Sequence, residues 1–157
     1  MKQQQGPFPS PGFLKQMAAN EVSPMLAVKS GEILADVRGA ALGAANVSGK
    51  ASDVWLSVEQ SGKDDTNTLS FTVDVLINGT SCLTTTPVIA HVSGEASTNK
   101  TTKVSGDTGI TQAIMDQDNN TVSLGDMITY ALTLTRTATP TTEMRNAAIV
   151  VEFEPAT

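Results

Sequence analysis

Four segments of the sequence alternate apolar and polar residues with the two-residue period of a β-strand. They cover residues 52–59, 69–77, 127–136 and 147–153. Successive side chains of a strand point to opposite faces, so each segment predicts a strand with one apolar face toward a core. Phe71 and Leu132 fall on these apolar faces, and we expect both side chains to be buried.

Turn residues divide the rest of the chain into shorter strands. Asn78-Gly79 predicts a tight hairpin, because both residues tolerate a positive φ. Ser30-Gly31 is expected as a turn, and residues 40–47 receive no assignment. After residue 50 no segment with helical periodicity is long enough to form the crossover helix of a parallel sheet. Further strands are expected at 25–28, 33–37, 81–85, 88–92 and 109–115, with polar loops at 62–67 and 93–103 and a turn at 116–120. The pattern predicts an all-β fold, an antiparallel β-sandwich of jelly-roll-like type.

Residues 1–23 differ from the rest and predict an extended N-terminal arm, with the β-sandwich domain at 24–157. Pro7, Pro9 and Pro11 restrict the backbone of the arm, although Ser10-Pro11 could also begin a short helix over 11–20. A simple solvated tail is the alternative, but such tails usually lack large apolar residues. We therefore predict that the arm binds a partner protein through Phe8, Phe13, Leu14 and Met17.

Composition narrows the classes of partner. Charged residues make up 17% of the chain, the net charge is -6, and lysines and arginines are scattered singly. Nucleic acids and anionic membrane surfaces are bound by concentrated positive charge, so neither is an expected partner. The sequence shows no signal-peptide pattern and no apolar run of membrane-spanning length. Threonine is abundant in the second half of the chain, and this β-branched residue favours a half-exposed sheet surface.

Reactive side chains are sparse, and we expect no enzyme, no cofactor and no metal. His91 is the only histidine, and no local motif places a nucleophile beside it. Cys82 is the only cysteine and is expected as a small core residue. Asp116, Asp118 and Asn120 match the start of a calcium loop, but the glycine and the bidentate glutamate that such a loop needs are replaced by Thr121 and Met127. A polar turn is the preferred interpretation.

Two groups of segments resemble small structural proteins of tailed bacteriophages, over roughly the last two-thirds of the chain. The first group comprises Asp53-Val54-Trp55, Phe71 to Gly79 and Ser81 to Pro87. The second comprises Gly125 to Thr129, Leu132 to Thr137, Pro140, Glu143-Met144 and Val150 to Pro155. These segments are similar to the strands and turns of capsid decoration (cement) proteins and related virion β-domains.

The resemblance implies a non-enzymatic virion structural protein, a homotrimer that binds the major capsid protein and stabilises the phage head lattice. It would assemble in the host cytoplasm and lie on the capsid exterior. A tail fibre or receptor-binding β-module is the alternative, which would need a ligand pocket at loop tips such as 62–67 or 93–107.

Overall fold

The computed structural model describes residues 24–136 and 139–156, and this part of the chain consists of antiparallel strands and loops without a helix. The arm residues predicted to bind a partner, Phe8, Phe13, Leu14 and Met17, lie outside the described residues. The prediction of an all-β antiparallel sandwich is confirmed, whereas the jelly-roll connectivity stays a prediction.

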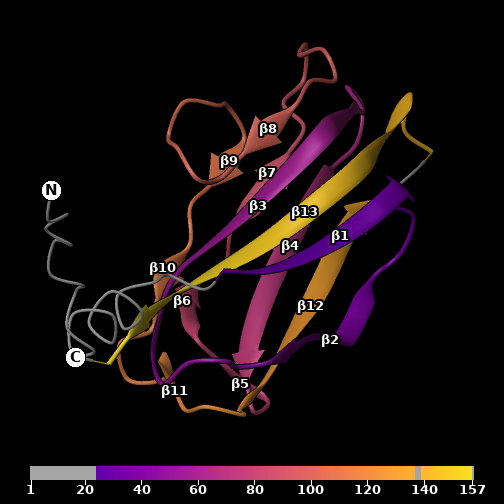
Figure 1. Cartoon of the computed structure of the whole chain (residues 1–157). Helices are drawn as coiled ribbons and strands as arrows, with labels where there is room; N and C mark the ends of the chain where they lie inside the picture. Colours follow the sequence, from indigo (N-terminus) through magenta and orange to yellow (C-terminus); the bar gives the residue numbers. More distant parts are fainter. Residues whose placement is uncertain (1–23, 137–138, 157) are drawn as a thin grey trace, which may run out of the picture.

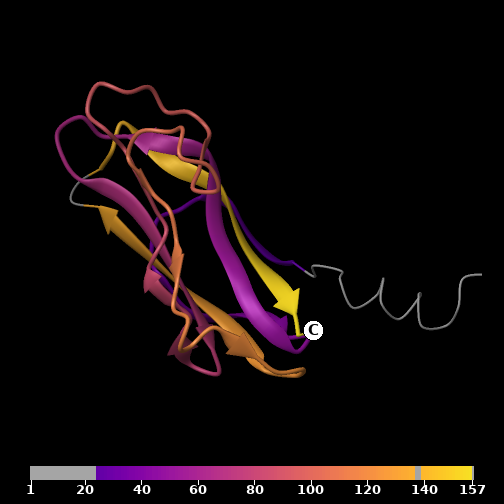
Figure 2. The same cartoon turned by 90° about the vertical axis from the view of Figure 1, so that its left-hand side faces the viewer.

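Two sheets face each other and form the two layers of the sandwich (Figures 1 and 2). Sheet A has the strand order β1 (Met25–Glu32), β13 (Thr142–Pro155), β3 (Gly49–Lys63) and β11 (Thr121–Val122), and β8 (Lys100–Thr101) also pairs with β3. Sheet B has the order β2 (Val37–Ala44), β12 (Met127–Arg136), β4 (Leu69–Ile77), β7 (Val88–Ala90) and β9 (Ile110–Thr111), and β5 (Thr80–Ser81) pairs with β4. A separate two-stranded sheet joins β6 (Leu83–Thr85) and β10 (Ile114–Met115).

The four strands with the clearest alternation are the long central strands, and their apolar faces meet in the core. Residues of β4 alternate between buried and half-buried along the whole strand. Phe71 and Leu132 are 0% and 1% exposed, so their predicted burial is confirmed. On sheet A, the inward side chains of Leu56, Ile149 and Phe153 are buried as well. Interdigitation of these two apolar faces holds the layers together.

The hairpin at Asn78-Gly79 is confirmed. Asn78 and Gly79 have φ values of 50° and 87°, and they join β4 to β5. The Asn78 side chain also accepts a hydrogen bond from the backbone N–H of Met127 at 3.0 Å and donates to Asp126 at 2.9 Å. Asn78 therefore fixes the start of β12 as well as its own turn.

The predicted turn at Ser30-Gly31 is wrong, because β1 continues through it to Glu32. Gly31 has a φ of 79°, and the register of β1 against β13 shifts between Lys29 and Glu32. The Gly31 N–H donates to Asn146 Oδ1 at 2.6 Å, so the glycine forms a bulge rather than a chain reversal.

Several strand boundaries also differ from the prediction. The strand predicted at 33–37 is not formed as expected, because residues 33–36 cross from one sheet to the other. The strand that follows is β2, which overlaps the stretch 40–47 that received no assignment. Strand β3 extends to Lys63, so the polar loop begins at residue 64. The segments 81–85 and 109–115 are each interrupted, because partner strands pair with only part of them.

Candidate functional site

The outer face of sheet A carries apolar side chains that the sandwich core does not cover. We call this surface the sheet A face and define it by five residues: Leu26 and Val28 of β1, Ala148 and Val150 of β13, and Trp55 of β3. Leu26 and Val28 are 60% and 61% exposed. A solvated sheet surface normally presents polar residues, so this face is suited to contact with another protein.

The strand register places these five residues next to one another. Leu26 lies opposite Val150, and Val150 lies opposite Trp55, which makes one row across three strands. Val28 and Ala148 form the adjoining row, which ends at Ser57. Cross-strand neighbours on one face are within contact distance, so the two rows form a continuous apolar surface.

The apolar surface follows from two uninterrupted apolar runs in the sequence. Residues 25–28 and 147–151 contain no polar residue, so their strands are apolar on both faces. The inward side chains of these runs are those of Met25, Ala27, Ile149 and Val151. The outward side chains are the apolar residues that define the sheet A face. A run of this kind is typical of strands covered on both sides. This signal could have identified the sheet A face, but only the inward side of residues 147–153 was predicted from the sequence.

Lys103 closes one end of the sheet A face. Its Nζ lies 3.9 Å from the centroid of the Trp55 ring, 2.7 Å from Asp53 Oδ2 and 3.2 Å from Glu152 Oε2. The hydrogen bond to Asp53 is the main cause that raises the pKa of Lys103 above its usual value. The ammonium group attracts both carboxylates and the negative face of the ring, so it holds the Trp55 side chain in place.

Polar contacts also border the apolar rows at their other end. Ser57 Oγ lies 2.9 Å from Thr101 Oγ1 and connects β3 to β8. Asn146 Nδ2 donates to Glu59 Oε2. The sheet A face is therefore an apolar centre with a charged or hydrogen-bonded rim, which is the arrangement found in protein interfaces.

His91 lies in the loops that follow β7, and its side chain is 1% exposed. Its Nε2 is 3.0 Å from Asp65 Oδ1, while its Nδ1 has no hydrogen-bond partner among the described residues. Asp65 also accepts a hydrogen bond from the Gly94 N–H at 2.8 Å, and this bond, followed by that of His91, lowers the pKa of Asp65 to about 2. Within the described residues this arrangement ties two loops together and places no nucleophile on the imidazole.

The Lys100 side chain also connects these loops through hydrogen bonds. Its side chain is 4% exposed, and its Nζ donates to Glu95 Oε2 at 2.7 Å, to Thr108 O at 2.7 Å and to Ala90 O at 3.2 Å. A buried ammonium is stable only when its protons are bound in this way. The loop side chains are therefore engaged with one another, which suits a structural role better than ligand capture.

Cys82 is buried, as predicted, and burial is the main cause that raises the pKa of its thiol to about 12. A thiol with such a pKa holds its proton at neutral pH and is a weak nucleophile. The residues 116–120 form the predicted turn: Asp116 accepts hydrogen bonds from Asp118 N at 3.0 Å and Asn119 Nδ2 at 2.8 Å. Among the described residues, no group of three or more His, Cys, Asp or Glu side chains is arranged to hold a metal ion.

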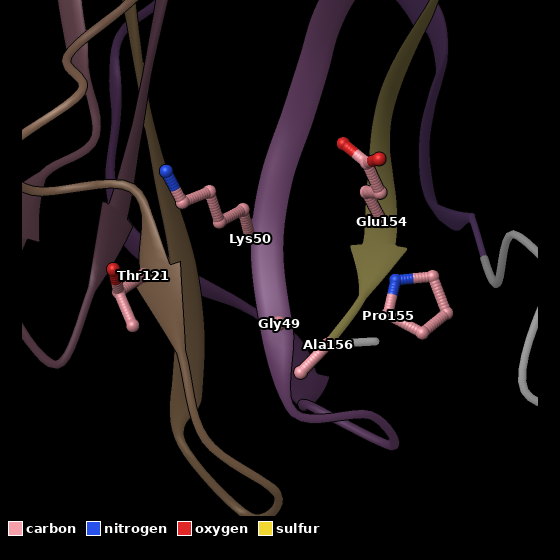
Figure 3. Close-up of a pocket in the computed structure, with 6 residues that line it drawn as sticks. All are labelled: Gly49, Lys50, Thr121, Glu154, Pro155 and Ala156. Atoms are coloured by element: carbon pink, nitrogen blue, oxygen red, sulfur yellow. The ribbon is translucent and has the colours of Figure 1, made fainter.

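A hollow of about 420 Å³ lies at the end of sheet A beside β11 (Figure 3). Its lining comprises Gly49, Lys50, Thr121, Glu154, Pro155 and Ala156. Lys50, Thr121 and Glu154 are exposed, and the hollow lies at the end of the molecule opposite the loops around β8 and β9 (Figure 1). It is thus not the loop-tip pocket that a receptor-binding module was expected to have.

Comparison with family models, with curated proteins and with solved structures finds no match to this chain. In the part of the chain that the structure describes, no helix is long and apolar enough to span a membrane. The sheet A face thus stands as the candidate functional site on its geometry alone.

Proposed function

We propose that this chain is a non-enzymatic structural protein that binds other protein surfaces through the sheet A face, and specifically a capsid decoration (cement) protein of a tailed bacteriophage. The observation that carries the proposal is the pair of apolar rows on the outside of β1, β13 and β3. The phage setting comes from the sequence resemblance, and it names the major capsid protein as partner and a homotrimer on the capsid exterior as the assembled form.

The arrangement of polar groups supports binding rather than chemistry. The single histidine is held by Asp65, and the single cysteine is buried with its proton bound. The loops around His91 use their charged side chains to bind one another. Association through the sheet A face would instead remove exposed leucine and valine side chains from water, which is the main driving force of protein association.

The test uses phage particles that lack this protein. The full chain is added, and the particles are imaged by electron cryomicroscopy and heated to measure capsid stability. We expect density at regular lattice positions on the head and a higher disruption temperature. Density confined to the tail would favour the fibre or receptor-binding alternative, and no binding to either part would contradict both functions.

A pair of variants tests whether the sheet A face is the contact between the copies of the proposed homotrimer, the form that would decorate the lattice. Val28→Asp places a carboxylate in the apolar rows, and Thr133→Asp places the same group at an exposed position on the outside of sheet B. The proposal expects Val28→Asp to lose lattice occupancy and Thr133→Asp to retain it. Equal occupancy of the two variants would contradict the role of the sheet A face.

A further inference from the structure

The sheet A face has a shape and chemistry that suit an apolar, extended segment. Its apolar rows are two residues deep along the strands, and from β1 to β3 they span two strand spacings, about 10 Å. Its rim bears the carboxylates of Asp53 and Glu152 against one ammonium, that of Lys103. An occupant should therefore be narrow, apolar and accompanied by positive charge.

We propose that residues 1–23 of a neighbouring copy occupy the sheet A face, with Phe13, Leu14 and Met17 lying over Leu26, Val28 and Val150. Each copy would give its segment to one neighbour and receive the segment of another, so the exchange closes in a cyclic oligomer. The inference deepens the proposed function and rests on the self-association proposed there.

Charge supports this occupant. Residues 1–23 contain Lys2, Lys15 and Glu21, which leaves 8 basic and 15 acidic residues of the chain's 10 and 16 in the remainder. The segment is thus net positive, while the rest of the chain is strongly negative. Lys15 directly follows Leu14, so docking of Leu14 in the apolar rows would bring its ammonium near the acidic rim.

The place where the segment joins the fold, and its length, support a neighbouring copy as its source. The segment ends beside Pro24 at the start of β1, on the edge of the sheet A face itself. Seven positions separate Met17 from Pro24 and eleven separate Phe13 from it, and these stretches can span about 20 Å and about 35 Å when extended. Pro7, Pro9 and Pro11 favour extended backbone. This reach exceeds the width of the chain's own face, about 10 Å, so it is long enough for the docking residues to reach the face of a neighbouring copy.

Cysteine crosslinking in the full chain tests the exchange directly. One copy carries Leu14→Cys, a second, mass-tagged copy carries Val28→Cys, and the two are mixed, so any disulfide between these positions must join different copies. The matched acceptor is Thr133→Cys on the outside of sheet B, which is also exposed. Native Cys82 can stay, because it is buried and its thiol has a pKa of about 12.

We expect the Leu14→Cys copy to crosslink with the Val28→Cys copy on the order of 100-fold faster than with the Thr133→Cys copy, because docking makes the reaction effectively intramolecular. Equal rates with both acceptors would overturn the inference. A chain carrying both Leu14→Cys and Val28→Cys distinguishes the source. Covalent oligomers support exchange, and a monomer closed on itself would show that each chain covers its own face.

Light scattering on the uncrosslinked variants separates this inference from the proposed function. An oligomer without preferential crosslinking overturns the exchange but leaves self-association intact. A monomeric chain at micromolar concentration overturns both.

Trp55 provides an independent readout, because it is the only tryptophan of the chain and lies in the sheet A face. A docked segment shields its ring, so Leu14→Ala with Met17→Ala should shift Trp55 emission to longer wavelength and increase its quenching by acrylamide. Gln3→Ala with Gln4→Ala, in the polar start of the same segment, is the matched control and should leave emission unchanged. Unchanged emission in the first variant would count against docking on this face.

Discussion

The outer faces of the two sheets differ although their inner faces are alike. Sheet A presents Leu26, Val28, Ala148 and Val150 to the outside. Sheet B presents mainly polar residues, among them Ser70, Thr72, Asp74, Thr133 and Thr135. Its outward apolar residues include Leu76, Val88, Ala90, Met127 and Ala131. Both inner faces consist mainly of apolar side chains, most of which are buried. Because the core does not need an apolar exterior on either sheet, the high exposure of Leu26 and Val28 supports the proposal that sheet A is the side that contacts a partner.

The largest expected effect is on folding stability, from substitutions on the inner faces of the sheets. Because these faces are alike, we expect similar losses on both sheets. Phe71→Ala in sheet B should lower the free energy of unfolding by about 3–5 kcal/mol, and Ile149→Ala in sheet A by about 2–5 kcal/mol, because each leaves a cavity in a closed core. Urea unfolding of the full chain measures both. A loss below about 1 kcal/mol on one sheet only would show that its inner face is loosely packed. That result would contradict the statement that the two inner faces are alike.

The outer faces should respond differently to the same substitution. Val28→Asp should weaken self-association by about 1.5–3 kcal/mol, which corresponds to roughly 10–150-fold, because the side chain can no longer be buried. Thr133→Asp should leave association unchanged. Sedimentation equilibrium measures both, and urea unfolding should show that neither variant changes folding stability by more than about 1 kcal/mol. Equal weakening by the two variants would remove the distinction between the faces.

Lys103 lies at one end of the apolar rows of sheet A, where it contacts Trp55 and two carboxylates. Lys103→Gln removes the ion pairs with Asp53 and Glu152 and the contact with the Trp55 ring, at a cost of about 0.5–1 kcal/mol since the ammonium is partly exposed. Trp55 emission should change at the same time. Lys50→Gln, which lies earlier than Trp55 in strand β3, is the control and should leave the Trp55 emission unaltered. An unchanged signal in Lys103→Gln would mean that the ring is positioned by packing alone.

The smallest effect concerns the connection between the sheets, since Asp65 lies in the loop from β3 to β4. Its pKa falls from 3.8 to about 2 in the folded state. A lowered pKa contributes stability above the unfolded value, and this contribution is lost as pH falls through the folded value. The stability difference between wild type and Asp65→Asn should therefore be constant above about pH 5 and shrink between pH 4 and 2, as measured by urea unfolding at each pH. A difference that stays constant across that range would show that His91 and Gly94 do not stabilise the carboxylate.

Much of the fold could be predicted from particular residues. The alternation in 69–77 depends only on the geometry of a strand, so it gave both the element and its buried side. Asn78 and Gly79 gave the hairpin because the requirement for positive φ is local. Gly31 also has a positive φ, yet it forms a bulge, because its N–H donates a hydrogen bond to Asn146, a residue 115 positions away that no local pattern reveals.

The candidate site was less accessible to sequence reasoning. Uninterrupted apolar runs at 25–28 and 147–151 were visible in the chain, but their outward members gain meaning only when they lie side by side. The register that joins Leu26 to Val150 and Val150 to Trp55 brings together three strands from the start, the first half and the end of the chain. Lys103 reaches Asp53 across 50 positions, and no local pattern marks that contact.

The sequence by itself determined the class of fold, the central strands and the residues that fill the core, because side-chain alternation and turn chemistry act over a few neighbouring residues. The tertiary structure decided which strands are neighbours, and with that the sheet A face, the Lys103 rim and the loops held by Lys100 and Asp65. These features depend on contacts between residues far apart in the chain. Such contacts form only when burial of the shared core fixes the register of every strand.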